Sequence, residues 1–90
     1  MSIWVKVDSE QVYMNISGDV LEEHSDFLKR KLLERFSYGY RKMTLNVNQV
    51  RSFDRQAMFM LGDMQELIES SGGQFLIEDN KNMLKEIESL

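Results

Sequence analysis

The chain has 90 residues, 42% hydrophobic and 29% charged, which is the composition of one folded domain and is too short for two. It contains no cysteine and a single histidine, His24, so disulfides, thiolate chemistry and a multi-histidine metal site within one chain are excluded. The formal net charge of -4 argues against nucleic acid as the main partner, because nucleic-acid binding relies on cations that neutralise phosphates. We therefore predict a single domain over residues 1–90 that uses no metal and no cofactor.

The N-terminus and the apolar stretches bear on the location of the protein. Residues Ile3 to Val7 lack the basic region and the apolar stretch of a signal peptide. The longest strongly apolar stretch, Ala57 to Leu61, is far too short to cross a bilayer. We therefore expect a cytoplasmic protein that does not insert directly into a membrane.

The first elements along the chain are predicted to be two strands in a hairpin. Apolar side chains alternate with others over residues 3–7 and again over residues 12–17, which is strand periodicity. Asp8-Ser9-Glu10 lies between the two segments and favours a turn. Gly18-Asp19 is expected to end the second strand.

A helix and a third strand are predicted next. From about His24 the period becomes helical, with Leu28, Leu32 and Phe36 four residues apart on one face, and Gly39 is expected to end the helix. Strand alternation returns over residues 43–47. Residues 48–52 are predicted to form a loop.

The second helix is predicted to begin at Asp54, whose side-chain oxygen can accept a hydrogen bond from a first-turn amide. Its glycine-containing end falls at residues 70–73, and Phe75 and Ile77 then indicate a fourth strand. A last helix is expected from Asn80, with Met83, Leu84 and Ile87 facing inward. The predicted buried stripe of the second helix consists of Ala57, Met60, Leu61, Met64, Leu67 and Ile68.

The predicted order is β-β-α-β-α-β-α, an α/β fold with a four-stranded mixed sheet. Right-handed crossovers between sequential strands place all helices on one face of such a sheet. Each strand alternates, whereas strands covered on both faces are usually continuously apolar, so the second face is expected to be partly wet. Trp4, Tyr13 and Leu76 would lie there as a candidate contact surface or as ordinary surface side chains.

Few residues in the chain suggest chemistry. Glu22-Glu23-His24 is the one place where carboxylates adjoin the imidazole, and we expect His24 to cap a helix start or to be solvated rather than to catalyse a reaction. Gly72-Gly73 follows a helix, so it does not form a phosphate loop. We therefore predict no catalytic residue. The cations of the first helix and the turn after it are expected to form a solvated face: Lys29, Arg30, Lys31, Arg35, Arg41 and Lys42.

Several short motifs resemble the STAS domain, the module of anti-sigma-factor antagonists and of the cytoplasmic tails of sulfate transporters. Residues 16–21, Ile-Ser-Gly-Asp-Val-Leu, are similar to the "SGELD" strand end of that family. Residues 45–54 are similar to its hydrophobic strand followed by V-x-x-hydrophobic-D, and residues 69–77 resemble the strand that follows its double glycine. The resemblance extends from about Ile16 to Leu90 and implies a right-handed βα superhelix.

The resemblance implies a bacterial signalling role in transcription regulation, in which the domain binds a kinase-like anti-sigma factor. Antagonists of the family carry Asp-Ser-Ser-Gly at the start of the second helix, where the second serine is phosphorylated. This chain has Asp54-Arg55-Gln56-Ala57, so Gln56 stands at the serine position and no phosphorylation site is expected. Ser52 falls where the family has a buried apolar residue and is not a candidate. The predicted partner-binding residues are Asp54, Arg55, Gln56, Met58, Phe59, Gly18 and Leu21.

Three alternatives stay open at this point. The domain could be a small accessory subunit of a membrane transporter, since some STAS proteins bind transporter ATPases. It could self-associate as a homodimer through the wet sheet face. It could also bind or transform a small molecule with His24 and either Glu22 or Glu23.

Overall fold

The computed structural model describes residues 1–82 and residue 84. These residues contain no helix that is long and apolar enough to span a membrane. The elements in chain order are β1 (Ser2–Val7), β2 (Gln11–Val20), the 3-10 turn η1 (Glu22–His24), α1 (Ser25–Ser37), β3 (Lys42–Phe53), α2 (Arg55–Ser70) and β4 (Gln74–Glu78).

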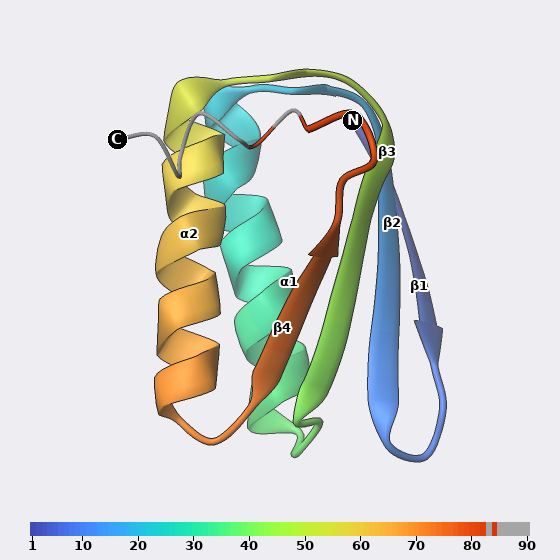
Figure 1. Cartoon of the computed structure of the whole chain (residues 1–90), viewed down its shortest axis with the longest axis vertical. Coiled ribbons are helices and arrows are strands. Elements are labelled where there is room, and N and C mark those ends of the chain that lie inside the picture. The colour runs from blue at the N-terminus through green and yellow to red at the C-terminus, as the bar shows by residue number, and fades with distance from the viewer. Residues whose placement is uncertain (83, 85–90) are drawn as a thin grey trace.

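The strands form one mixed sheet in the sequential order β1-β2-β3-β4. β1 pairs antiparallel with β2 as the predicted hairpin, whereas β2 with β3 and β3 with β4 are parallel pairs. Both helices lie side by side on one face of the sheet, and among the described residues the opposite face carries no helix (Figure 1). The predicted fold class and the one-sided helix layer are therefore confirmed for the described residues.

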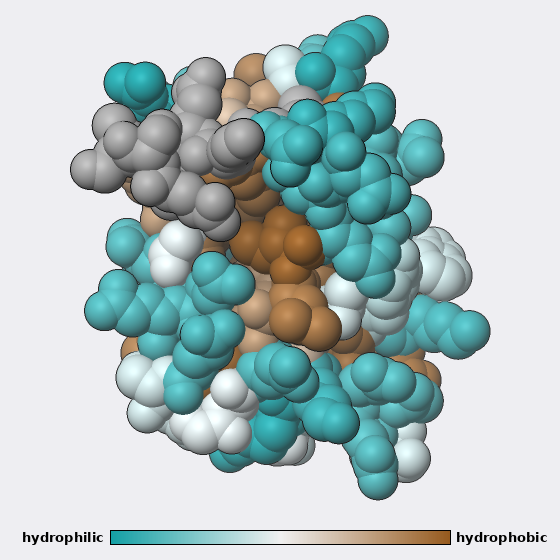
Figure 2. Space-filling view, in the orientation of Figure 1, coloured by the Kyte–Doolittle hydropathy of each residue, from teal (hydrophilic) through white to brown (hydrophobic). Residues whose placement is uncertain are grey.

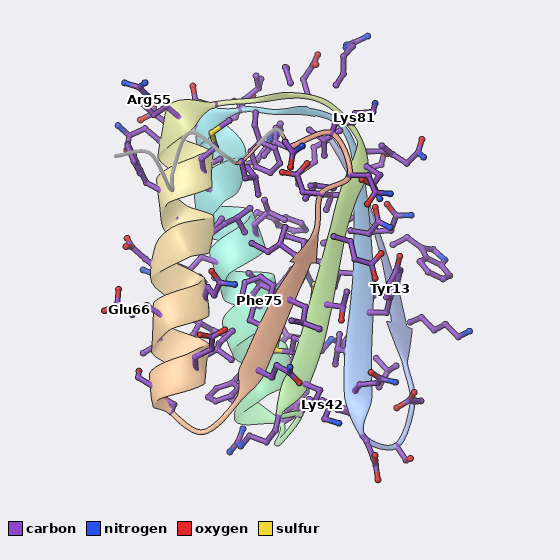
Figure 3. The ribbon with its side chains drawn as sticks, in the orientation of Figure 1. Tyr13, Lys42, Arg55, Glu66, Phe75 and Lys81 are labelled. Atoms are coloured by element: carbon purple, nitrogen blue, oxygen red, sulfur yellow. The ribbon has the colours of Figure 1, made fainter. Side chains whose placement is uncertain are left out.

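The hydrophobic core lies between the sheet and the two helices. Alternate residues of β2 and β3 point into it and are at most 2% exposed, because strand side chains alternate between faces. Leu28 and Leu32 of α1 face these strands, as the helical period predicts. Phe75 of β4 is fully buried, and Figure 3 shows its side chain on the helix side of the sheet, with Tyr13 on the opposite side.

The ends of the second and third strands differ from the prediction. β2 continues past Gly18-Asp19 to Val20, and β3 continues through the predicted loop 48–52 to Phe53. The two extensions pair with each other, with register shifts between Asn15 and Ser17 and between Gly18 and Asp19. Gly18 has a φ of 85°, a conformation that favours glycine at such bulges. The register shifts interrupt the alternation of buried and exposed side chains. For this reason the sequence pattern of residues 48–52 predicts a loop.

Two predictions about the second and third helices change. Leu67, assigned to the buried stripe of α2, is 45% exposed, and Met60 is only half-buried. The core stripe is the narrower set Ala57, Leu61, Met64 and Ile68. Most of the predicted third helix lies outside the described residues, among them Met83 and Ile87. Leu84 is described and is buried in the core, as predicted.

Apolar side chains also reach the surface on the side of the molecule where α2 faces β4. Figure 2 shows them gathered along the middle of this view, with hydrophilic side chains on both flanks. Among the described residues, the large apolar side chains with exposed fractions above one third are Trp4, Val7, Leu21, Tyr38, Phe59, Leu67 and Leu76.

Candidate functional site

The C-terminal end of β2 and the start of α2 are held together by backbone hydrogen bonds. Val20 pairs with Phe53 in the parallel ladder, and the Asp54 amide donates to the Val20 carbonyl at 2.8 Å. The Asp54 carboxylate accepts from the Gln56 amide at 2.8 Å, which confirms the predicted N-cap. The first turn of α2 is thereby fixed beside the segment that leaves β2.

This first turn presents three predicted partner-binding side chains to solvent. Arg55 and Gln56 are exposed, and Figure 3 shows Arg55 at the outer end of α2. Phe59 is 37% exposed, a large apolar side chain at the surface. Met58 is half-buried and packs against the core, so less of its side chain is open to a partner.

The other predicted residues lie on the segment from β2 to η1. Leu21 is 45% exposed, and its amide donates to His24 Nδ1 at 2.9 Å. His24 therefore caps the helix start, one of the two structural roles expected for it. Its Nε2 lies 4.0 Å from a Glu23 carboxylate oxygen. Gly18 lies farther back along β2, where an added Cβ would be 3.7 Å from Met1 Cα.

A surface cluster holds the ends of β2 and β3 together. Arg51 donates to both carboxylate oxygens of Asp19, at 3.0 Å from Nε and 2.6 Å from Nη2. Ser52 Oγ donates to Asp19 Oδ1 at 2.8 Å. These hydrogen bonds, from Arg51 first and then Ser52, hold the pKa of Asp19 well below its ordinary value of 3.8. Asp19 therefore stays ionised and links the two strand ends.

A groove of about 420 Å³ runs between the α1 side and the α2 side of the helix layer. It contains both Gln56 and Phe59, and its α2 wall continues to Leu67. The α1 wall and its approach are polar. The groove is lined by Glu22, Ser25, Asp26, Lys29, Gln56, Phe59, Met60, Asp63, Met64 and Leu67.

Of the residues that line this groove, only Gln56 and Phe59 are among the predicted partner-binding residues. Phe59, Asp63 and Leu67 are four residues apart and all exposed, so they form a second line on α2 beside the buried stripe. That spacing is visible in the sequence and could have indicated a second face. The helical period cannot show which of two adjacent lines meets the sheet, because that depends on how the helix is rotated against its neighbours.

The family model of the STAS domain matches residues 3–89. This chain belongs to the STAS family. STAS domains are generally non-catalytic regulatory domains. A search of the curated proteins found no match for this STAS chain.

Solved structures with this fold include the anti-sigma factor antagonist SpoIIAA in its unphosphorylated form, with a TM-score of 0.80 and 11% identity over 98% of this chain and 82% of that one. The phosphorylated form of the Bacillus protein SpoIIAA gives a TM-score of 0.79 and 14% identity over the same shares of the two chains. The NMR structure of the protein TM1081 gives a TM-score of 0.79 and 21% identity over 94% of this chain and 69% of that one.

Mglu is similar as well, with a TM-score of 0.80 and 16% identity over 89% of this chain. This STAS chain spans only 20% of the length of the Mglu chain that it matches. At these identities the similarities concern the fold. The chain is thus a STAS domain whose fold resembles that of anti-sigma factor antagonists.

The open sheet face of this STAS domain is a second candidate surface. A band of side chains crosses it from β1 to β4: the Trp4 and Tyr13 rings meet edge to face, with centroids 6.4 Å apart. Asn46 Nδ2 donates to the Tyr13 hydroxyl at 2.7 Å and to Glu78 Oε2 at 3.0 Å. Trp4 is 56% exposed and Leu76 51%, so the predicted wet face is confirmed.

Metal-binding and acid-base chemistry have little support within this STAS domain. No group of three or more histidine, cysteine, aspartate or glutamate side chains in residues 1–82 and 84 is placed to hold a metal ion. His24 Nδ1 already accepts a hydrogen bond from the Leu21 amide. The described residues therefore offer three candidate surfaces: the exposed helix start, the groove and the open sheet face.

Proposed function

We propose that this STAS domain is a non-catalytic regulatory module of the anti-sigma-antagonist type, which binds a kinase-like anti-sigma factor through the start of α2. The binding surface comprises the predicted residues Asp54, Arg55, Gln56 and Phe59, with Leu21 beside them, whereas Met58 supports it from within. The observation that carries the proposal is the exposed Phe59 on a helix start that Asp54 holds in place.

The start of α2 is ordered before a partner binds. A side chain that is already ordered loses less conformational entropy on binding. The Asp54 cap and the bond from the Asp54 amide to Val20 fix the first turn of α2 without a partner. A partly exposed aromatic ring on such a turn supplies buried apolar area to a partner, and aromatic residues are enriched among the side chains that dominate protein interfaces.

We further propose that this module is not switched by serine phosphorylation. Neither Arg55 nor Gln56 has a hydroxyl group that could accept phosphate at the helix start. The Gln56 amide, which could otherwise bind an anion there, donates to the Asp54 carboxylate. The domain therefore binds its partner without the usual switch.

The experiment is capture of partners by the tagged chain from its own cells, identification by mass spectrometry, and measurement of affinity with the purified partner. We expect a kinase-like ATPase, with about thirtyfold weaker binding for Phe59→Ala, because truncation of a central aromatic side chain at an interface costs about 2 kcal/mol or more. Gln56→Asp should weaken binding as well. Leu76→Ala on the open sheet face is the matched control and should bind like the natural chain.

The proposed absence of a phosphorylation switch is tested separately. The purified ATPase and labelled ATP are incubated with the natural chain and with Gln56→Ser, which restores a hydroxyl at that position. We expect no label between residues 48 and 59 of the natural chain, a stretch whose one hydroxyl side chain is Ser52, and label on Gln56→Ser. Label in that stretch of the natural chain would disprove the absence of a switch.

The same capture decides between the alternatives. Recovery of transporter subunits in place of the ATPase would make the domain a transporter accessory subunit. A mass in solution that rises with protein concentration would point to a self-associating scaffold. Either result would replace the proposed function.

A further inference from the structure

Two helix faces line the groove between α1 and α2 without filling it. On α2 the lining residues follow the spacing of a single helical face, from Gln56 through Phe59 and Asp63 to Leu67. The first and last of these positions are eleven steps apart along the helix, or about 16 Å at 1.5 Å per residue. Because β2, β3 and β4 are parallel, the helices that join them run in the same direction (Figure 1). The seam between two such helices is long enough to receive about three turns of another helix.

The rim of the groove is acidic. Glu22, Asp26 and Asp63 contribute three carboxylates, against the single ammonium group of Lys29. Within residues 1–82 and 84, none of the three carboxylates forms an ion pair at 4.0 Å or less. An occupant with positive charge would supply the missing counter-charges.

The wall that α2 contributes is apolar and adaptable. Phe59 is 37% and Leu67 45% exposed at its surface, and Met60 and Met64 line it between them. Methionine side chains adjust to the shape of a ligand because they are unbranched and flexible.

We infer that this groove binds an amphipathic α-helix of a partner protein, with leucine-like side chains against Phe59 and Leu67 and lysine or arginine against Asp26 and Asp63. The inference rests on the proposed function only in taking the partner to be a protein. An amphipathic helix in an apolar groove is a common mode of recognition, with anchors at positions i, i+4 and i+7.

The probe is a synthetic helical peptide of about 18 residues, long enough to be helical in water, with leucines at i, i+4 and i+7 and lysines on both flanks. A matched peptide has glutamate in place of every lysine. Each is titrated into the uniformly ¹⁵N-labelled full chain, and amide shifts are followed by NMR. We expect the basic peptide to shift the amides of Asp26, Phe59, Asp63 and Leu67. Salt should weaken this binding, because charges on the rim are screened.

Two exposed leucines provide a matched pair of variants. Leu67 lies in the groove and is 45% exposed, and Leu76 lies on the open sheet face and is 51% exposed. Leu67→Glu should reduce affinity for the basic peptide at least about tenfold, a loss of 1.4 kcal/mol, and Leu76→Glu should leave it unchanged. Asp63→Lys should weaken the basic peptide and strengthen the acidic one, which a merely structural role of Asp63 would not produce.

Several results would overturn the inference: no shifts, shifts centred outside the groove, equal binding of the two peptides, or equal effects of the two leucine variants. Groove shifts that appear on concentrating the chain alone would assign the groove to a second copy, through its basic α1 side chains such as Arg30. The captured ATPase separates this inference from the proposed function. If Leu67→Glu retains the ATPase and the peptide does not bind, only the groove inference fails. If the peptide binds in the groove but no ATPase is captured, only the proposed function fails.

Discussion

The two faces of the sheet differ although the same strands build both. In β4, Phe75 is fully buried beneath the helices, while its neighbour Leu76 is 51% exposed on the open face. In β2, Met14 is 1% exposed, while Tyr13 takes part in the hydrogen-bonded band across the open face. One face is therefore held by packing and the other by polar contacts. Stability should depend chiefly on the first, because burial of apolar area contributes more than exposed hydrogen bonds do.

The largest expected effect compares two neighbours in β4. Phe75→Ala should lower the free energy of unfolding by about 3–5 kcal/mol, because it opens a cavity in the core. Leu76→Ala should change it by no more than about 0.5 kcal/mol, as is usual for exposed positions. Urea unfolding followed by circular dichroism measures both. Similar losses for the two variants would mean that the two faces do not differ in their contribution to stability.

A smaller loss of stability is expected at Gly73, where the backbone lies close to packed side chains. A Cβ added to Gly73 would lie 2.8 Å from side-chain atoms of both Phe36 and Ile68, and 3.1 Å from the Arg41 carbonyl oxygen. Gly73→Ala should therefore lower the free energy of unfolding by about 1–3 kcal/mol through overpacking. Gly39→Ala is not a suitable control, because Gly39 has a φ of 105°. Ser71→Ala, at an exposed position nearby, should be nearly neutral in the same urea assay.

Substitutions on the open sheet face should lower the free energy of unfolding less than those in the core. Tyr13→Phe removes the hydroxyl that accepts from Asn46 at 2.7 Å, and we expect a loss of about 0.5–1.5 kcal/mol in the free energy of unfolding. The Asn46 amide keeps its bond to Glu78, which limits the loss. Tyr13→Phe combined with Asn46→Ala should be less destabilising than the sum of the two single variants. Full additivity would show that the band is not a connected unit.

The smallest effect should come from the ionic cluster at the strand ends, and it should depend on pH. Since the pKa of Asp19 is lowered in the folded chain, its contribution is present above the ordinary value of 3.8 and is lost as the pH falls through the folded value. Compared with Asp19→Asn, the natural chain should have a higher urea midpoint at about pH 6, with the difference shrinking below about pH 4. Added salt should reduce it, since the pair is solvent-exposed. If the difference in urea midpoint between the natural chain and Asp19→Asn grew at low pH, Asp19 would not stabilise the fold as an ionised carboxylate.

The candidate site was only partly predictable from the sequence. Asp54 as the helix cap, His24 as a cap and exposure of Phe59 followed from local patterns, because capping and helical spacing involve residues that are close in the chain. Leu67 was assigned to the buried stripe but is exposed. It lies at the margin of the core stripe of α2, where a small rotation of the helix decides between burial and exposure.

The sequence by itself determined the order of the strands and helices in the described residues, the side of each strand that is buried, and the resemblance to the STAS family. These follow from periodicity, glycine and capping residues, and short motifs, all of which are local. The tertiary structure alone decided that residues 48–53 continue β3, that Leu67 is exposed, and that an acidic groove lies between α1 and α2. Each of these depends on contacts between residues far apart in the chain, which no local pattern contains.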